Sequence, residues 1–266
     1  MTDTPLQPRP AATVMLIRDA SAEGIEVFLM RRHKAMDFVG GVIVFPGGGV
    51  DDRDRNADID WYGPPPSWWA ERLGVDEDLA LALICAAARE TFEESGVLFA
   101  GPVGDPDTVV GDAGIYRESR LALADNTLSF GDFLRSEQLV LRADLLRPWA
   151  NWVTPEEERT RRYDTYFFVG ALPEGQRADG DNTESDKAGW ATPEEALADF
   201  EAKRTFLLPP TWTQLDSLAS RTVAEVLAVE RKITAIQPHL VEAEGNWEIE
   251  FFDSGRYNAA RAGRAP

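Results

Sequence analysis

Three glutamates, Glu90, Glu93 and Glu94, lie close together in the segment 89–97. On a helix these positions correspond to i, i+3 and i+4, so the three carboxylates would share one face. Like charges at this spacing repel one another and weaken an isolated helix. A hard divalent cation, which prefers oxygen ligands, would neutralise that repulsion. The pattern indicates a metal site, unless the side chains only form a solvated helix face, which is the usual role of such a turn.

A strand and a glycine-rich loop precede this segment and favour the metal site. Residues 42–45 form an apolar run that predicts a strand, and Gly47, Gly48 and Gly49 follow it. Because glycine carries no side chain, the backbone of this loop can approach a ligand closely. Residues 79–95 are predicted to form the helix, since they begin with alanines and leucines and Gly96 follows as a stop.

The strand, the glycine loop and the acidic helix together resemble the Nudix box, the motif of the Nudix hydrolases. Its pattern is G-x5-E-x7-R-E-U-x-E-E-x-G-U, in which U is a bulky apolar residue. Thr91 is a weak substitute at the first apolar position. The remaining matches are Gly48, Arg89, Glu90, Glu93, Glu94, Gly96 and Val97. The resemblance implies an α/β fold, the Nudix-type α-β-α sandwich with a mixed sheet, and metal-dependent hydrolysis of a diphosphate linkage.

An insertion of about twenty-seven residues interrupts the box, at about residues 51–78. Counting back from Arg89 gives Leu81 where the family has an isolated glutamate, which supports the loop more than it binds metal. Asp54 falls at the family's offset from Gly48, but it precedes the insertion, so its equivalence stays open. The resemblance therefore leaves the partner of Arg89 unassigned.

The insertion is rich in aromatic residues and prolines. Its aromatic side chains could stack on the base of a ligand or pack the insertion onto the body, and packing is the favoured interpretation. Three consecutive prolines predict an extended path instead of a helix. The residues concerned are Trp61, Tyr62, Trp68 and Trp69, and Pro64, Pro65 and Pro66.

An interrupted box is a trait of one Nudix subgroup, and the chain is similar to that subgroup from residue 11 to about residue 215. The subgroup includes the mammalian peroxisomal coenzyme A diphosphatase and actinobacterial relatives. Its motif R-x3-G-x3-F-P-G-G is matched in its second half by residues 41–48, whereas Asp37 stands at the position of the arginine. The resemblance favours coenzyme A or acyl-coenzyme A as the substrate, with ADP-ribose, NADH or another nucleotide as the alternative.

The resemblance also implies roles for individual residues. It assigns Glu90, Glu93 and Glu94 as metal ligands. Glu93 and Glu94 are also assigned as catalytic groups, together with Arg89, which would orient a carboxylate. Glu184 is a general base, a further ligand or only an exposed loop acid, and the glutamates at 156–158 are alternatives to it. Arginine pairs bidentately with phosphate, although arginines that flank strands are often solvated edge residues. The candidate substrate-binding residues are Gly47, Gly48, Arg31, Arg32, Arg161 and Arg162.

The choice of metal and the class of protein follow from the residues that are present. The only histidines are His33 and His239, so a carboxylate site for Mg²⁺ or Mn²⁺ is favoured over a histidine site. The alternative from another class is a non-catalytic Nudix-fold module that binds a ligand or a protein. Such modules usually lack a metal carboxylate, and all three are present here, which favours an enzyme.

A formal net charge of −19 argues against a nucleic-acid-binding surface, which needs a clustered basic footprint, and opposes binding to anionic membranes. An anionic small-molecule substrate would need a divalent cation to overcome the same field. Residues 1–11 lack a basic segment followed by an apolar one, and the longest apolar stretch, residues 79–88, is too short to span a bilayer. The sequence predicts a soluble cytoplasmic protein.

The pattern of apolar residues predicts how these elements are arranged along the chain. Strands are expected at 13–17, 27–30, 42–45, 149–154, 163–170 and 247–252, and helices at 79–95, 116–124, 130–137, from 192, and over 211–236. Residues 1–10 read as a flexible tail and 11–210 as the Nudix domain. Residues 211–266 form a C-terminal helical extension that packs on the domain or builds a homodimer interface.

Overall fold

Strand β1 (Arg9–Asp19) contributes side chains to two separate apolar layers. Ala12, Val14 and Leu16 lie in one cluster of buried residues, and Met15 and Ile17 lie in the other. Successive side chains of a strand point to opposite faces, so this alternation makes β1 a central strand covered on both sides. The computed structural model describes residues 6–20, 24–33, 41–55, 58–183, 185–243 and 246–263.

The main sheet is mixed, with the strand order β10-β2-β1-β9-β8-β11. The pairs β1–β9 and β8–β11 are parallel, and the other pairs are antiparallel. The strands in this order have the following bounds: β10 (Ser185–Ala191), β2 (Ile25–Arg32), β9 (Tyr163–Ala171), β8 (Leu146–Val153) and β11 (Ala235–Ile236).

Two short strands fill the space where β1 and β2 separate. β3 (Ile43–Val44) pairs with β2, and β4 (Gly47–Gly49) pairs with β1, where Gly48 lies opposite Ala12. The predicted strand at 42–45 is thus confirmed for its two central residues, as β3. Its continuation as β4 places the glycine loop on the sheet beside β1.

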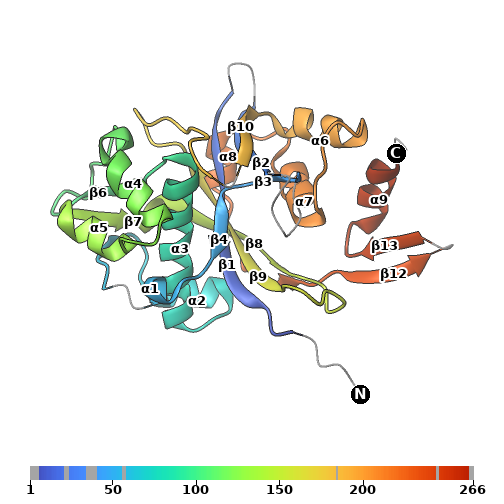
Figure 1. Ribbon diagram of the computed structural model, residues 1–266, viewed down its shortest axis with the longest axis horizontal. Coiled ribbons are helices and arrows are strands. Elements are labelled where there is room, and N and C mark those ends of the chain that lie inside the picture. The colour runs from blue at the N-terminus through green and yellow to red at the C-terminus, as the bar shows by residue number, and fades with distance from the viewer. Residues whose placement is uncertain are drawn as a thin grey trace.

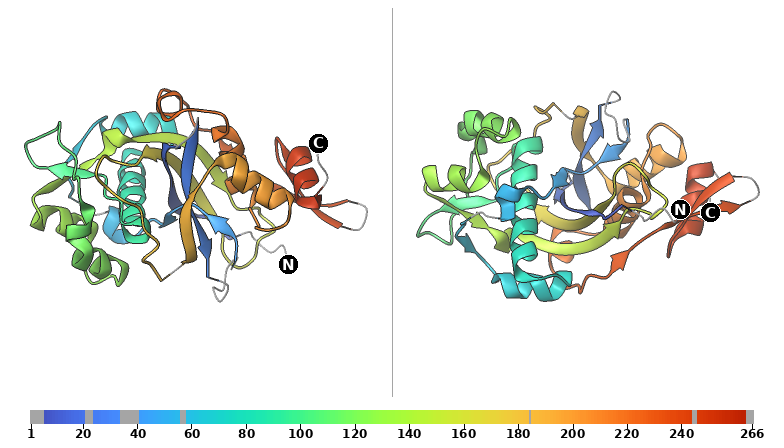
Figure 2. Two further views of the ribbon diagram at one scale, coloured as in Figure 1. Left: turned by 90° about the horizontal axis from the view of Figure 1, so that it is seen from above. Right: turned by 60° about the horizontal axis from the view of Figure 1, so that its bottom comes forward.

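Helices cover both faces of the main sheet (Figures 1 and 2). One face packs against α2 (Pro66–Leu73), α3 (Glu77–Ser95), α4 (Arg117–Ala124) and α5 (Phe130–Ser136). The other face packs against α6 (Pro193–Glu201), α7 (Pro209–Leu218), α8 (Val223–Leu227) and α9 (Ser254–Ala262). The predicted helices at 79–95, 116–124 and 130–137 are confirmed within one or two residues as α3, α4 and α5.

A second, three-stranded sheet lies beyond α3 with α4 and α5 (Figure 1). Its order is β5-β7-β6, and η1 (Ala113–Tyr116) leads into α4. The remaining elements on this side are α1 (Asp52–Arg55), β5 (Trp61–Tyr62), β6 (Ala100–Pro102), β7 (Leu139–Arg142) and η2 (Ala143–Leu145).

The insertion is anchored by its aromatic residues, as expected. Trp69 is fully buried and its ring lies 6.1 Å from that of Phe168, on the central sheet. The expectation that all three prolines lie outside a helix is wrong for Pro66. Pro65 is extended, and Pro66 is the first residue of α2, where its missing N–H and fixed φ suit a helix start.

The predicted helix over 211–236 is wrong. α7 ends at Leu218, Ser220 has a left-handed φ of 59°, and α8 begins after Thr222. The Thr222 side chain accepts a hydrogen bond from the backbone of Glu225, whose side chain accepts one from the backbone of Thr222. This capping box starts a new helix where the apolar pattern alone suggested a continuous one.

The C-terminal residues add a hairpin and a last helix at one end of the molecule (Figures 1 and 2). β12 (His239–Ala243) pairs with β13 (Asn246–Glu250), so the strand expected at 247–252 is confirmed in most of its length. Tyr257 of α9 is fully buried and donates its hydroxyl to the backbone oxygen of Leu207, at 3.0 Å. Within the described ranges, no helix has the length and apolar character needed to cross a membrane.

Candidate active site

The last turns of α3 face the glycine strand β4. The N-cap of α3 is Asp76, whose side chain accepts a hydrogen bond from the Leu79 backbone, and its C-cap is Gly96, which has a left-handed φ of 73°. Gly47 donates its backbone N–H to Glu94 Oε2 at 2.7 Å. A Cβ on Gly48 would lie only 2.5 Å from Glu90 Oε1, so a side chain at this position would displace the Glu90 carboxylate. Two of the three predicted carboxylates therefore contact the predicted glycine loop.

Arg89 lies at the centre of the site and is held by Asp54. Asp54 Oδ1 accepts a bond from Arg89 Nε at 3.0 Å, and Oδ2 accepts one from Nη2 at 2.9 Å. Asp54 is 1% exposed, and its Oδ2 also accepts the Asp51 backbone N–H at 2.8 Å. Arg89 Nη2 further donates to the backbone oxygen of Gly49 at 3.1 Å. The Arg89–Asp54 pair thus links α3, α1 and the end of the glycine strand.

This contact bears on the isolated glutamate of the box, for which the sequence left Asp54 as an open candidate. Asp54 lies at the family's offset from Gly48, and its carboxylate accepts hydrogen bonds from Arg89 and from the Asp51 backbone. The position eight residues before Arg89, Leu81, is not where that carboxylate is found. Asp54 is therefore the candidate for the family's isolated carboxylate, and the bounds of the insertion, about residues 51–78, stay a prediction.

The other carboxylates on this face also surround Arg89. Its Nη1 lies 2.9 Å from Glu90 Oε1 and 3.3 Å from Glu93 Oε1. Burial raises the pKa of Glu90 to about 7, although Arg89 opposes the shift, and burial likewise raises the pKa of Glu93. Burial works to lower the pKa of Arg89, but Glu90 and Asp54 outweigh it and raise that pKa. One guanidinium thus faces three carboxylates in a site with little solvent.

The chemistry of these donors fits a hard divalent cation, because they are desolvated carboxylates in excess over the cationic groups. Their orientation is a separate matter. Among the residues that the structure describes, no three His, Cys, Asp or Glu side chains converge closely enough to enclose a metal ion. Glu90 and Glu93 are turned toward Arg89, and Glu94 toward the Gly47 amide.

Thr91, at the apolar position of the box, is fully buried. Its hydroxyl donates to the backbone oxygen of Ala87 at 2.7 Å. Because this bond to the preceding turn satisfies the hydroxyl, threonine is accommodated where the motif has an apolar residue.

The four predicted arginines lie in different settings. Arg31 lies opposite Ile43 in the β2–β3 strand pair, and its side chain forms an ion pair with Asp186 at 2.6 Å. Arg32 follows it at the end of β2. Arg161 is exposed in the loop before β9. Arg162 is buried and donates to the backbone oxygens of Thr154 and Leu6, so it holds the loop.

The loop with Arg161 lies at the same end of the sheet as the glycine strand. Tyr163 lies opposite Arg9, and Ala12 lies opposite Gly48. Arg9 and Ala12 are three residue steps apart on β1, which corresponds to roughly 10 Å along a strand. Arg161 therefore stays a candidate for binding the substrate.

The candidate bases are not brought into the site by any described contact. Glu184 lies outside the described residues. Glu156 and Glu157 are exposed, and Glu158 accepts bonds from the backbone and hydroxyl of Thr160 within its own loop.

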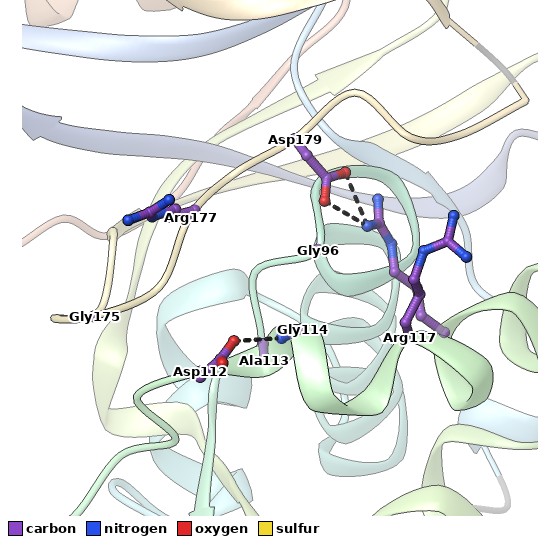
Figure 3. A pocket seen from close by; sticks show the side chains of 9 residues that line it. Gly96, Asp112, Ala113, Gly114, Arg117, Gly175, Arg177 and Asp179 are labelled. Carbon is purple, nitrogen blue, oxygen red and sulfur yellow. Dashed lines mark hydrogen bonds and ion pairs between the residues drawn. The ribbon is translucent and has the colours of Figure 1, made fainter.

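Sequence reasoning missed a group of residues around the end of α3. A cavity of about 390 Å³ adjoins Gly96 there and is lined by Asp179, Arg117 and Arg120 (Figure 3). Arg120 is 7% exposed, and its Nη1 donates to both carboxylate oxygens of Asp179 at 2.8 and 2.9 Å. No sequence motif singled out these residues, because they come from α4 and from the loop before β10.

Comparison with known proteins agrees with this arrangement. The family model described as NUDT19 Nudix domain matches residues 68–218, more than half of the chain. The human protein "Acyl-coenzyme A diphosphatase NUDT19" is 31% identical over 252 residues, which cover 80% of this chain and 65% of that protein. The protein of the same name from Xenopus laevis is 27% identical over 228 residues, 73% of this chain and 59% of that protein. The chain thus spans less than two thirds of the length of these relatives.

A solved structure is similar over most of its length. The NUDIX hydrolase from Alicyclobacillus acidocaldarius has a TM-score of 0.69 and 26% sequence identity, covering 85% of this chain and 98% of that chain. The α-β-α arrangement expected from the sequence is confirmed by this likeness.

Proposed function

Because the chain belongs to the family of the NUDT19 Nudix domain, we propose that it hydrolyses the diphosphate linkage of a nucleoside diphosphate derivative with a divalent cation. The observation that carries this proposal is the meeting of the α3 carboxylates with the glycine strand around Arg89. Glu94 contacts Gly47, Glu90 lies against Gly48, and Glu93 lies beside Arg89. Clustering these carboxylates costs free energy, because it buries negative charge. The stability of the helix therefore does not explain the arrangement.

Glu90, Glu93 and Glu94 would hold the cation, which we propose to be Mg²⁺ or Mn²⁺. The bound cation supplies charge neutralisation and an activated water to the hydrolysis of a diphosphate. Arg89 keeps Glu90 and Glu93 in place and is itself fixed by Asp54. Gly47 and Gly48 let the backbone approach the ligand, and Arg161 and Arg31 are candidates for pairing with the phosphates.

We propose coenzyme A or an acyl-coenzyme A as the substrate. The support is the name of the curated relatives, which are acyl-coenzyme A diphosphatases, together with the interrupted box. Cleavage of the diphosphate would release a phosphopantetheine and adenosine 3′,5′-bisphosphate. ADP-ribose and NADH carry the same linkage and are the substrates to compare. A small-molecule partner is part of this proposal, whereas the homodimer and the cytoplasmic compartment stay predictions.

The experiment is a screen of the purified protein with Mg²⁺ and with Mn²⁺. Coenzyme A, acetyl-coenzyme A, ADP-ribose and NADH are compared by kcat/KM, with product identified by chromatography. Preference for the coenzyme A species supports the proposal in full. Preference for ADP-ribose or NADH keeps the hydrolase and overturns the substrate. Metal binding without turnover of any diphosphate would favour a non-catalytic ligand-binding module and overturn the enzyme.

A further inference from the structure

The last turn of α3 is held by groups from outside the helix. Backbone oxygens at the end of a helix have no partner within it, and helix ends fray unless such groups are satisfied. Glu93 and Glu94 belong to this last turn, since α3 ends at Ser95. Their carboxylates are therefore attached to the part of the helix that is intrinsically the least fixed.

Each of the last four backbone oxygens of α3 accepts a hydrogen bond. Phe92 accepts one from the Gly96 backbone at 2.9 Å, which is the helix's own C-cap. The other three donors come from distant parts of the chain. They are Arg120 Nε to Glu93 O at 3.0 Å, Asn182 Nδ2 to Glu94 O at 2.8 Å, and the Asp179 backbone N–H to Ser95 O at 2.9 Å.

These donors are themselves fixed. Arg120 is bound to both oxygens of the Asp179 carboxylate, and Figure 3 shows these two contacts of Asp179 next to Gly96. A Cβ on Gly96 would lie 2.8 Å from Arg120 Nη1 and 3.0 Å from Asp179 Oδ2, so the helix end and the pair are closely packed. Asn182 Oδ1 accepts the Ser185 backbone N–H at 2.8 Å, which ties the start of β10 to the same helix end.

We propose that Asn182 and Arg120 are positioning residues that fix the last turn of α3 and hence the carboxylates of Glu93 and Glu94. The inference rests on the proposed function, in which these carboxylates hold the cation. It adds that α4 and the loop before β10 set the geometry of the site without touching the substrate. A misplacement of about 1 Å in such a site can lower a rate by about a hundredfold.

The chain offers a matched control for this role. Gln176 is buried, and its Nε2 donates to the backbone oxygens of Leu98 and Val110, at 2.8 and 2.6 Å, while its Oε1 accepts the Leu98 N–H. Gln176 thus makes the same kind of amide contacts as Asn182, but to the segment after the helix. Asn182→Asp and Gln176→Glu both turn an amide donor into a carboxylate that faces backbone oxygens.

The experiment compares the two variants with the wild-type protein by kcat and KM, by thermal unfolding, and by titration with Mn²⁺ in the absence of substrate. We expect Asn182→Asp to lower kcat by between about tenfold and a hundredfold. KM should stay within about twofold, and Mn²⁺ affinity should fall. Gln176→Glu should lower the melting temperature at least as much as Asn182→Asp does, because Gln176 is the more buried residue. Its kcat and Mn²⁺ affinity should nevertheless stay near the wild-type values.

Unchanged kcat and Mn²⁺ affinity in Asn182→Asp would overturn the positioning role, and so would an equal loss of both in Gln176→Glu. If Asn182→Asp does not fold, Arg120→Lys takes its place. A lysine keeps the positive charge that pairs with Asp179. It lacks the planar guanidinium whose Nε also donates to the Glu93 backbone oxygen, so the same loss of kcat and Mn²⁺ affinity is expected. If the wild-type protein turns over no diphosphate, the proposed function fails, and the Mn²⁺ titrations alone decide the positioning role.

Discussion

The Arg89–Asp54 pair gives the sharpest prediction about the stability of the site. In Asp54→Asn, one carboxylate oxygen that accepts a guanidinium N–H is replaced by an amide that is itself a donor. The pair is almost fully desolvated, since the side chains of Arg89 and Asp54 are 10% and 2% exposed. Breaking a buried pair by removing one partner costs about 3–5 kcal/mol. Arg89 keeps Glu90 and Glu93 as neighbours, so we expect the lower end, about 3 kcal/mol.

The assay is chemical unfolding of the metal-free protein, with thermal unfolding as a second measurement. A loss of about 3 kcal/mol corresponds to a decrease of roughly 6–12 °C in melting temperature for a chain of this size. Asp58→Asn is the matched control, because it makes the same chemical change on an exposed side chain and should stay within about 0.5 kcal/mol of the wild type. A loss below about 1 kcal/mol in Asp54→Asn would refute the view that Asp54 is the anchor of Arg89.

Three further predictions concern the insertion, the C-terminal segment and the metal. Trp69→Ala should cost about 3–5 kcal/mol of unfolding free energy, since Trp69 anchors the insertion in the core, and a loss near that of a surface substitution would contradict the anchoring. Thr222→Ala should cost about 1 kcal/mol, measured by chemical unfolding, because it removes the capping box of α8, whereas no effect would mean that the cap is dispensable. Mn²⁺ at about a hundred times its Kd should stabilise the wild type by about 2.7 kcal/mol and leave Glu90→Gln much less stabilised, and equal stabilisation of both would exclude Glu90 as a ligand.

The sequence predicted the parts of the site that are local in the chain. Residues 79–95 form a helix because their composition and the glycine after them agree, and the spacing of Glu90, Glu93 and Glu94 then fixes their shared face. The contact of this face with Gly47 and Gly48 followed from the resemblance to the box, because no local rule brings Gly47 to Glu94, 47 residues further along the chain.

The parts that the sequence did not predict depend on contacts between distant residues. An insertion hides which side of it keeps the original spacing, so Asp54 could not be matched to Arg89 until their side chains were seen together. Arg120 and Asn182 belong to no motif, because a donor for a helix end is chosen by position in space. The long helix expected after Pro210 was an avoidable error, since the residues Thr222 and Glu225 carry the spacing of a capping box.

The most direct test of the central claim is the turnover of acetyl-coenzyme A, with saturating Mg²⁺ or Mn²⁺, by the wild type and by Glu93→Gln. The substitution keeps the size of a side chain that lies 3.3 Å from Arg89, so the fold should be retained, which circular dichroism and thermal unfolding would check. The account predicts metal-dependent cleavage of the diphosphate by the wild type and loss of at least about 99% of kcat in the variant, equivalent to about 2.7 kcal/mol of transition-state stabilisation. Undiminished turnover in Glu93→Gln, or turnover by the wild type without any divalent cation, would contradict it.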